Sequence, residues 1–319
     1  MSDSAKVFLI TGATGSLGTL LTQQILSQGH KVRAYARNEH GHEKLIQSLP
    51  SEARPRLASC IGAVEDLPRL HRAMAGVDYV IHAAAMKVIG LCEYSPAEAV
   101  KTNILGTQNV VDACIDAGVE RAVFISSDKA AASVNHYGHT KAAGEKLWLH
   151  GNHYSPEHQP FVAVRYGNCW ASQGSVFHVF KEQAATGQLT VTDPEATRFH
   201  WMLGDAVDFV MKALFGAQPG EMWVPMLPAY KMDDLAKAFA VVKGLREPYK
   251  VIGLRPGEKR HESMIAEDEG FMSTRKDKHF VITPGRSAKE PISTGYHSST
   301  PWRMSRQELV GLIEETLNG

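Results

Sequence analysis

The chain has 319 residues, 44% of them hydrophobic and 21% charged, so it can bury a large core in one elaborated α/β domain or two closely joined domains. Lysine plus arginine and aspartate plus glutamate both total 34, which removes any bulk electrostatic reason to expect binding to nucleic acid or to a membrane surface. The 4 cysteines show no CxxC spacing and no apolar leader opens the chain, so we expect a cytoplasmic protein without a zinc site or disulfide framework.

Strand-like and helix-like stretches alternate through the first half of the chain. In chain order, the pattern predicts strands at 7–10, 31–35, 79–83, 122–126 and 161–165, and helices at 17–28, 66–74, 97–117 and 137–150. This βαβ alternation predicts an α/β fold with a Rossmann-type, doubly wound parallel sheet.

The second half is less regular, with Pro and Gly clusters and a final amphipathic helix predicted at 305–317. A polar stretch at 273–294 is interpreted as a long surface connection. We therefore expect an NADP-binding Rossmann domain over 1–170, with a later return near 203–228, and a smaller C-terminal substrate-binding domain over 171–319.

A glycine turn, GATGSLG at 12–18, follows the first predicted strand and opens the first predicted helix. Glycines let the backbone approach a pyrophosphate, and the free N–H groups of the helix start receive its charge. Tight turns also need glycine without any ligand, but the position within a βαβ unit favours dinucleotide binding. The candidate cofactor residues of this turn are Gly12, Thr14, Gly15, Ser16, Leu17 and Gly18.

The end of the second strand carries Arg37 and lacks the acidic residue that would bind a free ribose 2′-hydroxyl. A guanidinium can bind a 2′-phosphate through charge-assisted hydrogen bonds, so this position favours NADP over NAD. The alternative is an arginine that merely ends a strand in solvent.

A YxxxK motif formed by Tyr137 and Lys141 stands ten residues after a serine pair at the end of the strand predicted at 122–126. Residues at i and i+4 share a helix face, so the lysine ammonium can stand beside the phenol and lower its pKa toward working pH. Tyr137 then becomes a candidate base for a sugar hydroxyl. By chance, the same motif would be only a packed tyrosine and a solvated lysine.

An acid and an amine, Asp128 and Lys129, directly follow Ser127, where the crevice of a doubly wound sheet should open. A dehydratase needs two such extra groups, one to remove a proton beside a transient ketone and one to protonate the departing hydroxyl. A pair of this kind in a turn is otherwise ordinary surface charge.

From about Lys6 to Asp268, these residues resemble the inverting UDP-N-acetylglucosamine 4,6-dehydratases of pseudaminic acid synthesis, within the extended short-chain dehydrogenases/reductases. The matching stretches are VDYVIHAAAMK at 77–87, KTNILGTQNVVDAC at 101–114, SSDKAAASVNHYGHTKAAGEKL at 126–147, VRYGN at 164–168, VTDPEATRF at 191–199 and GLRPGEKRHE at 253–262. So many ordered motifs exclude accidental similarity.

The resemblance implies a role for each matching position. Ser127 would bind the sugar near C4, Asp128 would be the acid, Lys129 the base at C5, and Tyr137 with Lys141 would serve C4 oxidation. Further cofactor positions would be Ala83, Ala84, Ala85 and Asn103, and the UDP-sugar substrate would meet Met86, Lys87, Asn168, Arg198, Arg255 and Glu258. Tyr137 favours the inverting branch, because the membrane-attached retaining relatives commonly carry methionine there. We also expect a homo-oligomer, either a dimer or a hexamer.

Several positions depart from the family pattern, most of them near the expected sugar pocket. Alanines replace an adenine-contacting aspartate and a glycine, Ala-Ser replaces Asn-Pro, and Val-Ile-Gly replaces His-Val-Pro, at Ala63, Ala171, Ala132-Ser133 and Val88-Ile89-Gly90 respectively. His136 and Trp170 are also unusual. The acyl group, hexose or product can therefore differ from the family norm.

Three other functions compete with dehydration. A nucleotide-sugar epimerase would return hydride to the same carbon and would not need Asp128 and Lys129. A non-catalytic NADP-sensing protein would not need Ser127, Tyr137 and Lys141 together. A metal hydrolase would have to use some of the 15 histidines, but no acidic third ligand has recognisable spacing, so no metal is expected.

Overall fold

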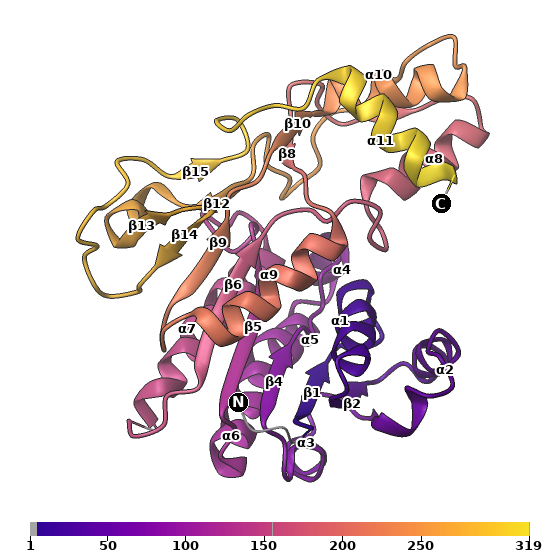
Figure 1. Cartoon of the computed structure of the whole chain (residues 1–319). Coiled ribbons are helices and arrows are strands. Elements are labelled where there is room, and N and C mark those ends of the chain that lie inside the picture. The colour runs from indigo at the N-terminus through magenta and orange to yellow at the C-terminus, as the bar shows by residue number, and fades with distance from the viewer. Residues whose placement is uncertain (1–4, 155, 319) are drawn as a thin grey trace.

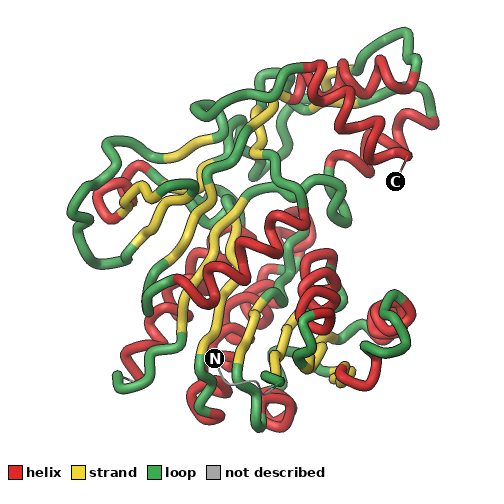
Figure 2. Tube along the Cα trace, in the orientation of Figure 1, coloured by secondary structure: helices red, strands yellow, loops and turns green. Residues whose placement is uncertain are grey.

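The computed structural model describes residues 5–154 and 156–318, and its centre is a large sheet built mainly by the first half of the chain (Figures 1 and 2). Among the described residues, nine strands of this sheet lie in the order β13-β14-β9-β6-β5-β4-β1-β2-β3. Their bounds are β1 Val7–Thr11, β2 Lys31–Ala36, β3 Leu57–Ile61, β4 Tyr79–His82, β5 Arg121–Ser127, β6 Phe161–Tyr166, β9 Met222–Pro225, β13 Ser273–Lys276 and β14 His279–Ile282. The seven neighbouring strands β3, β2, β1, β4, β5, β6 and β9 run parallel to one another, which confirms the Rossmann-type prediction.

Helices cover both faces of the sheet (Figure 1). The helices around it are α1 Ser16–Ser27, α2 Glu39–Gln47, α3 Leu67–Met74, α6 Gly106–Ala117, α7 His136–Tyr154 and α9 Leu203–Gly216. Local signals set their ends: the Asp66 side chain caps α3 by accepting from the Arg69 N–H at 3.0 Å, and α6 ends at Gly118 with φ of 65°. Buried apolar residues of every central strand pack between these layers.

The helix predicted at 97–117 is interrupted in the middle. It consists of α5, Pro96–Val100, a π-helical turn at Lys101–Leu105, and then α6. The wider turn carries Asn103, which is 1% exposed, into the protein beneath the loop that follows β4. π-turns of this kind are frequent near functional sites.

The second half adds a smaller lobe with its own apolar core, seen at the top of Figure 1. Its helices and short strands are α8 Val176–Ala185, α10 Met232–Lys243, α11 Arg306–Asn318, β7 Thr190–Val191, β8 Thr197–Phe199, β10 Ala229–Lys231 and β11 Lys250–Val251. The other short elements are α4 Ile89–Tyr94, η1 Arg54–Arg56, η3 Glu267–Met272, β12 Ser263–Ile265 and β15 Tyr296–His297. The predicted C-terminal helix is thus present as α11.

The interpretation of residues 273–294 as a surface connection is wrong for its first part. Residues 273–282 form the β13–β14 hairpin, and β14 pairs antiparallel with β9 at the edge of the large sheet. Phe280 and Ile282 are buried against the main core, whereas the lysines around the turn lie outside. The few apolar residues of this segment are buried only because β14 pairs with β9, which is distant in the sequence, so the local composition did not reveal the hairpin.

A buried ionic cluster joins the sheet to the second half. Arg165 on β6 is 2% exposed and forms hydrogen bonds to Glu145 on α7 at 2.8 and 2.6 Å and to Glu269 on η3 at 2.6 and 2.8 Å. Ser126 on β5 also donates to Glu145. Removing one partner would leave an unpaired charge in the interior, so the cluster holds β5, β6, α7 and η3 in one arrangement.

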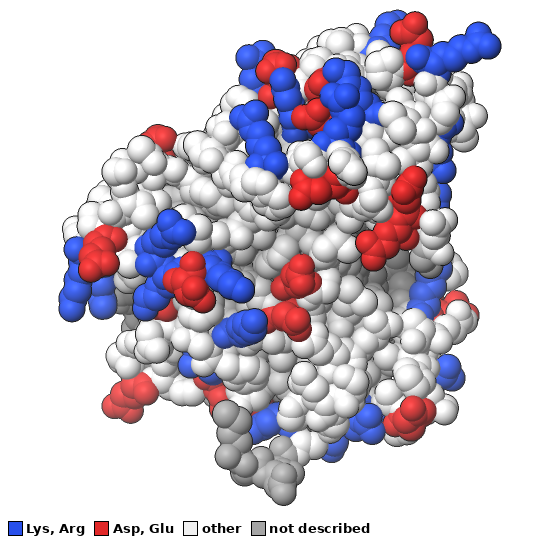
Figure 3. All heavy atoms as spheres, turned by 45° about the horizontal axis from the view of Figure 1, so that its top comes forward, with Lys and Arg blue, Asp and Glu red and all other residues white. Residues whose placement is uncertain are grey.

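Charged side chains of both signs are interspersed over the face shown in Figure 3. Over residues 5–154 and 156–318, no helix has the length and apolar character that crossing a membrane requires.

Two alanines adopt left-handed backbone conformations, Ala132 with φ of 44° and Ala171 with φ of 52°. At these two positions the resemblance described above leads us to expect asparagine and glycine. Both usual residues tolerate positive φ better than alanine does, because the alanine Cβ crowds the backbone there. Both alanines therefore hold a backbone conformation that their residue type disfavours.

Ala171→Gly is expected to raise the free energy of unfolding by up to about 1 kcal/mol, because relief of the left-handed strain exceeds the entropy that glycine adds to the unfolded chain. Urea denaturation measures the change. The matched control is Ala184→Gly inside α8, which should lower stability by about 1 kcal/mol. Equal destabilisation by both changes would contradict the strain at Ala171.

Candidate active site

The centre of the site lies at the carboxyl end of β5, beside the start of α7. Ser127 ends the strand, and its hydroxyl donates to Asp128 Oδ1 at 2.9 Å and accepts from the Lys129 N–H at 3.3 Å. Asp128 is only 1% exposed, and the Lys129 side chain is 15% exposed. The pair predicted from the sequence is therefore buried in the crevice and does not form part of a solvated turn.

Asp128 and Lys129 form an ion pair, with Lys129 Nζ 2.9 Å from Asp128 Oδ2. Burial raises the pKa of Asp128, and the negative charge of Glu262 acts in the same direction. Burial alone would lower the pKa of Lys129, but the charges of Asp128 and Glu262 outweigh it and hold that pKa above its usual value. Lys129 is thus protonated in the free protein, whereas the mechanism expected from the family resemblance requires a neutral amine.

The second half of the chain supplies further charges to this centre. Glu262 Oε1 lies 3.4 Å from Lys129 Nζ and 3.6 Å from Arg198 Nε, and Arg198 Nη2 donates to Glu258 at 2.9 Å. Glu262 was not singled out from the sequence. Its only signal was its place in the stretch GLRPGEKRHE, because no local pattern shows that this carboxylate reaches Lys129.

Tyr137, at the start of α7, is 9% exposed and packs with Cys92, Ala99 and Met86. Burial raises the pKa of its phenol to about 12, against the opposing effects of a hydrogen bond with Ser127 and the charge of Lys129. The free protein therefore does not show the lowered phenol pKa that the YxxxK spacing predicted. Loss of water around the ring outweighs the nearby positive charge.

Lys141 is brought to the site by the same helix, but its ammonium is buried, with 3% of the residue exposed. Its Nζ donates to the Ile125 carbonyl at 2.7 Å and lies 3.8 Å from the centre of the Phe124 ring. Burial lowers its pKa to about 7, although the charge of Glu145 acts in the opposite direction. Lys141 can therefore change its protonation state near neutral pH.

The glycine turn has the shape that a dinucleotide needs. Gly12 has φ of 71°, and a Cβ there would lie 2.8 Å from the Ala84 nitrogen, while a Cβ on Gly18 would lie 2.5 Å from the Gly12 oxygen. These contacts explain two of the glycines by close backbone packing. Gly15 precedes α1 without a side-chain cap, and the first turn of that helix carries no acidic residue. The helix N–H groups at Ser16 and Leu17 are thus suited to a pyrophosphate.

The loop after β4 forms the other wall of the predicted dinucleotide site. Ala83 and Ala84 donate their N–H groups to the Thr11 carbonyl at 3.1 Å and the Thr11 hydroxyl at 3.2 Å. Ala85 follows before Met86, whose N–H donates to Asn103 Oδ1 at 2.8 Å. Asn103 Nδ2 donates to the Met86 carbonyl and to Thr140, each at 2.9 Å. The amide of Asn103 therefore holds this loop to α7.

At the adenosine end of the site, Arg37 is 62% exposed and its Nη1 lies 3.8 Å from Glu65 Oε1. Its neighbour Asn38 caps α2 by accepting from the Gly41 N–H at 3.1 Å. Ala63 contributes its carbonyl, which accepts from the Tyr35 hydroxyl at 2.8 Å. The Arg37 guanidinium is thus accessible to a bound phosphate, and the Glu65 carboxylate is the charged group beside it.

Three of the predicted substrate residues, Asn168, Arg198 and Arg255, differ in their exposure and in the partners that they contact. Asn168 meets the catalytic centre directly, because its Oδ1 accepts from Lys129 Nζ at 3.3 Å. Arg198 is buried, and its guanidinium is occupied by Glu258, Glu262 and the carbonyls of Thr197 and Arg260. Arg255 is exposed, and its N–H lies 3.3 Å from Glu258. The structure thus leaves Arg255 accessible and commits Arg198 to partners within the protein.

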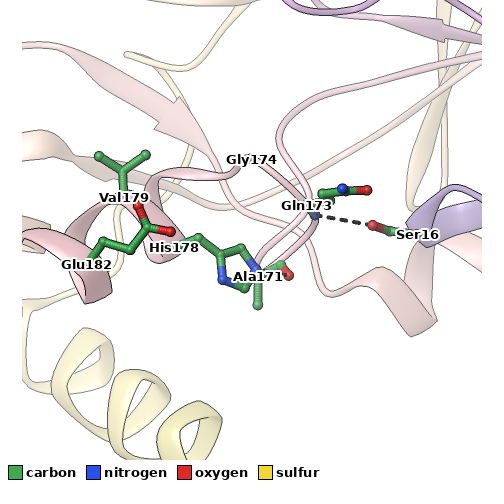
Figure 4. A pocket seen from close by; sticks show the side chains of 7 residues that line it. All are labelled: Ser16, Ala171, Gln173, Gly174, His178, Val179 and Glu182. Carbon is green, nitrogen blue, oxygen red and sulfur yellow. Dashed lines mark hydrogen bonds between the residues drawn. The ribbon is translucent and has the colours of Figure 1, made fainter.

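A cavity of about 490 Å³ lies between the glycine turn and α8 (Figure 4). Its lining combines residues of both halves, Ser16, Ala171, Gln173, Gly174, His178, Val179 and Glu182. The Gln173 N–H donates to the Ser16 hydroxyl at 3.1 Å, and Lys87 Nζ donates to the Gln173 carbonyl at 3.3 Å. The loop after β6 therefore contacts both the start of α1, at Ser16, and Lys87, one of the predicted sugar-binding residues.

Comparison with known proteins agrees with this geometry. The polysaccharide biosynthesis protein family matches residues 8–284. The chain belongs to this family. The UDP-N-acetylglucosamine 4,6-dehydratase (inverting) of Campylobacter jejuni is 36% identical, over 98% of both chains, and the UDP-glucose 4-epimerase of Rickettsia akari is 37% identical, over 83% of this chain and 79% of its own.

Solved structures of other proteins share the fold of this chain. The structure of Pen from Bacillus thuringiensis superposes with a TM-score of 0.91 at 34% identity and covers 99% of each chain. The dTDP-glucose 4,6-dehydratase DesIV of Streptomyces venezuelae, solved with NAD, shares the fold with a TM-score of 0.70 at 20% identity, over 79% of this chain and 86% of its own. The Rossmann-type architecture of the family therefore holds for this chain.

The buried Lys141 predicts a pH-dependent stability. Its pKa is about 7 in the folded protein against an ordinary 10.5, so the unfolded chain binds more protons between these pH values and the stability rises with pH across that window. Lys141→Met should therefore stabilise the free protein by a few kcal/mol below pH 7, and this gain should disappear toward pH 10. Thermal unfolding from pH 6 to 10 measures it. The control Lys146→Met, at an exposed position of α7, should show no such trend.

Proposed function

We propose that this protein is an NADP-dependent 4,6-dehydratase of UDP-N-acetylglucosamine or a close UDP-hexose, giving a 4-keto-6-deoxy sugar inverted at C5. The observation that carries the proposal is the buried Asp128–Lys129 pair beside Tyr137, because elimination needs an acid and a base that C4 oxidation alone does not use. The near-complete coverage of the Campylobacter jejuni dehydratase supports it.

The residues of the glycine turn fit a nicotinamide dinucleotide, which would supply the hydride acceptor for C4 and the hydride donor for C6 when bound. Gly12, Gly15 and Gly18 bring the backbone close, and the uncapped start of α1 would receive the pyrophosphate. Ala83 to Ala85 and the Tyr137–Lys141 turn would border the nicotinamide half. We assign the 2′-phosphate of NADP to Arg37, supported by its exposed guanidinium.

Tyr137 would remove the C4 hydroxyl proton while Ser127 holds the same oxygen. The raised phenol pKa of the free protein means that Tyr137 starts protonated and needs positive charge nearby before it can act as a base. Lys141, one helical turn away, supplies such charge when it is protonated. The phenol proton must therefore be released to solvent before Tyr137 can accept the proton of the C4 hydroxyl.

Lys129 and Asp128 would carry the elimination. A proton that moves from Lys129 Nζ to Asp128 Oδ2, 2.9 Å away, converts the ion pair into a neutral amine and a neutral carboxylic acid without changing the net charge. Burial favours the neutral pair because it penalises both charges. Lys129 then takes the C5 proton, and Asp128 protonates the departing 6-hydroxyl, which leaves as water.

The UDP-sugar would be held between the two halves. We assign Met86, Lys87 and Asn168 to the sugar side and the exposed Arg255 to the diphosphate, with bidentate hydrogen bonds supplying the charge that a neutral protein must concentrate locally. Glu258 orders the Arg255 turn, and Arg198 acts on the substrate through Glu258 and Glu262.

We also propose a division into an NADP-binding domain over residues 1–170, with the return at 203–228, and a substrate-binding domain over 171–319. The separate apolar core around Phe177, Phe239 and Ile313 supports it, whereas residues 273–282 belong by their pairing to the large sheet. A cytoplasmic homo-oligomer, dimer or hexamer, remains part of the proposal.

The second candidate is a UDP-sugar 4-epimerase, favoured by the 37% identity to the Rickettsia akari protein. Such an enzyme would use Ser127, Tyr137 and Lys141 in the same way. It would have no use for an acid and a base beside C5, so the buried Asp128–Lys129 pair favours the dehydratase.

Turnover of UDP-N-acetylglucosamine deuterated at C4, in heavy water, tests the reaction. We expect loss of water, the C4 deuterium at C6 and solvent deuterium at C5, read by mass spectrometry and NMR. Lys129→Ala should abolish water loss and exchange at C5 while sparing cofactor binding, because the base is missing. Deuterium that returns to C4 with the 6-hydroxyl retained would make the protein an epimerase.

Arg37→Ala tests the cofactor. The affinity for NADP is expected to fall about 10- to 100-fold because charge-assisted hydrogen bonds to the 2′-phosphate are lost, whereas the affinity for NAD should hardly change. Fluorescence titration of both dinucleotides measures the ratio. Arg37→Lys keeps the charge without the planar fork and should fall between the two. An unchanged ratio in Arg37→Ala would exclude this role.

A further inference from the structure

Glu262 is a buried carboxylate that the second half of the chain places against the reacting centre. It precedes β12 and is 4% exposed. Its N–H donates to the Ser298 hydroxyl at 2.9 Å, and its carbonyl accepts from the Ser298 N–H at 2.8 Å. Ser298 is itself bonded to Thr197, so the backbone at Glu262 is fixed on both sides.

The two carboxylate oxygens of Glu262 have different surroundings. Oε1 lies 3.4 Å from Lys129 Nζ and 3.6 Å from Arg198 Nε, whereas Oε2 is buried without a hydrogen-bond partner among the residues that the structure describes. Burying a carboxylate costs folding free energy unless its charge is paired, and most buried polar atoms are hydrogen-bonded. Glu262 is therefore held as an anion next to Lys129, and its Oε2 can still accept a hydrogen bond.

We propose that Glu262 is a positioning residue of the elimination step, which aims Lys129 Nζ at C5 and stabilises the ammonium that forms when Lys129 takes the proton. This inference rests on the proposed dehydratase function. Lys129 lies between two carboxylates, Asp128 beside it in the turn after β5 and Glu262 from the second half of the chain, so its amine is held from both sides. Arg198 keeps Glu262 ionised, which gives this buried arginine a role without direct contact to substrate.

The effect of removing this charge has a defined sign. The charged and titratable groups around Lys129 are Asp128 directly after β5, Tyr137 on α7, Cys169 after β6, Arg198 on β8, Tyr230 on β10, and Lys259 and Glu262 before β12. Asp128 and Lys129 share protons, so they titrate as a pair with two apparent pKa values. Loss of a neighbouring negative charge lowers both values, because every protonated form of the pair becomes less favourable.

The test is Glu262→Gln, assayed as the rate of water loss and of C5 deuterium exchange across pH. We expect the maximum rate to fall about tenfold or more and both limbs of the pH profile to move to lower pH. Glu258→Gln is the matched comparison, because it also removes a carboxylate from Arg198 but does not contact Lys129. It should leave the limbs in place, whatever its effect on KM. Glu262→Asp keeps the charge and should keep the limbs while lowering the rate.

The outcomes separate the two proposals. A wild-type protein that releases no water would overturn the dehydratase function. A wild-type protein that dehydrates, with Glu262→Gln limbs unmoved or moved no more than those of Glu258→Gln, would overturn the role of Glu262. NADP affinity in each variant reports folding, and if Glu262→Gln does not fold, an unchanged rate in Glu262→Asp overturns the positioning role.

Discussion

Arg165 is the buried charge on which the arrangement of the site depends. Its guanidinium is 2% exposed and bridges one carboxylate on α7 and another on η3, so the helix that carries Tyr137 and Lys141 is fixed to the segment that follows Glu262 and β12. Burial alone would lower the pKa of this arginine, but the two carboxylates outweigh it and hold that pKa above the usual value, so the guanidinium stays ionised. Because an isolated charge is poorly tolerated in the interior, the two halves are held in one relative position.

The same loss of solvent acts in opposite directions on the groups of the site. It raises the pKa of Tyr137 and Asp128, whose ionised forms are negative, and lowers that of Lys141, whose ionised form is positive. Lys129 escapes this trend because carboxylates face it from two sides. Burial thus provides neutral groups for proton transfer, and the local pairing decides which lysine keeps its charge in the free protein.

Two loop alanines show that the fold can impose a backbone conformation that the residue type disfavours. Ala132 and Ala171 keep positive φ although neither is glycine or asparagine. Ala171 also lines the cavity beside the glycine turn, and Ala132 lies in the loop before α7. The surrounding contacts therefore impose the loop conformation, and the residue type adapts at some cost in strain.

The sequence by itself determined the parallel sheet, the glycine turn and the places of Ser127, Asp128, Lys129, Tyr137 and Lys141, because each depends on periodicity or spacing along a few neighbouring elements. Three features became visible only in the folded structure: Glu262 contacts both Lys129 and Arg198, residues 273–282 extend the sheet, and Lys129 is protonated in the free protein. These features depend on contacts between segments that lie far apart in the sequence and on the exclusion of water, and local sequence patterns contain neither.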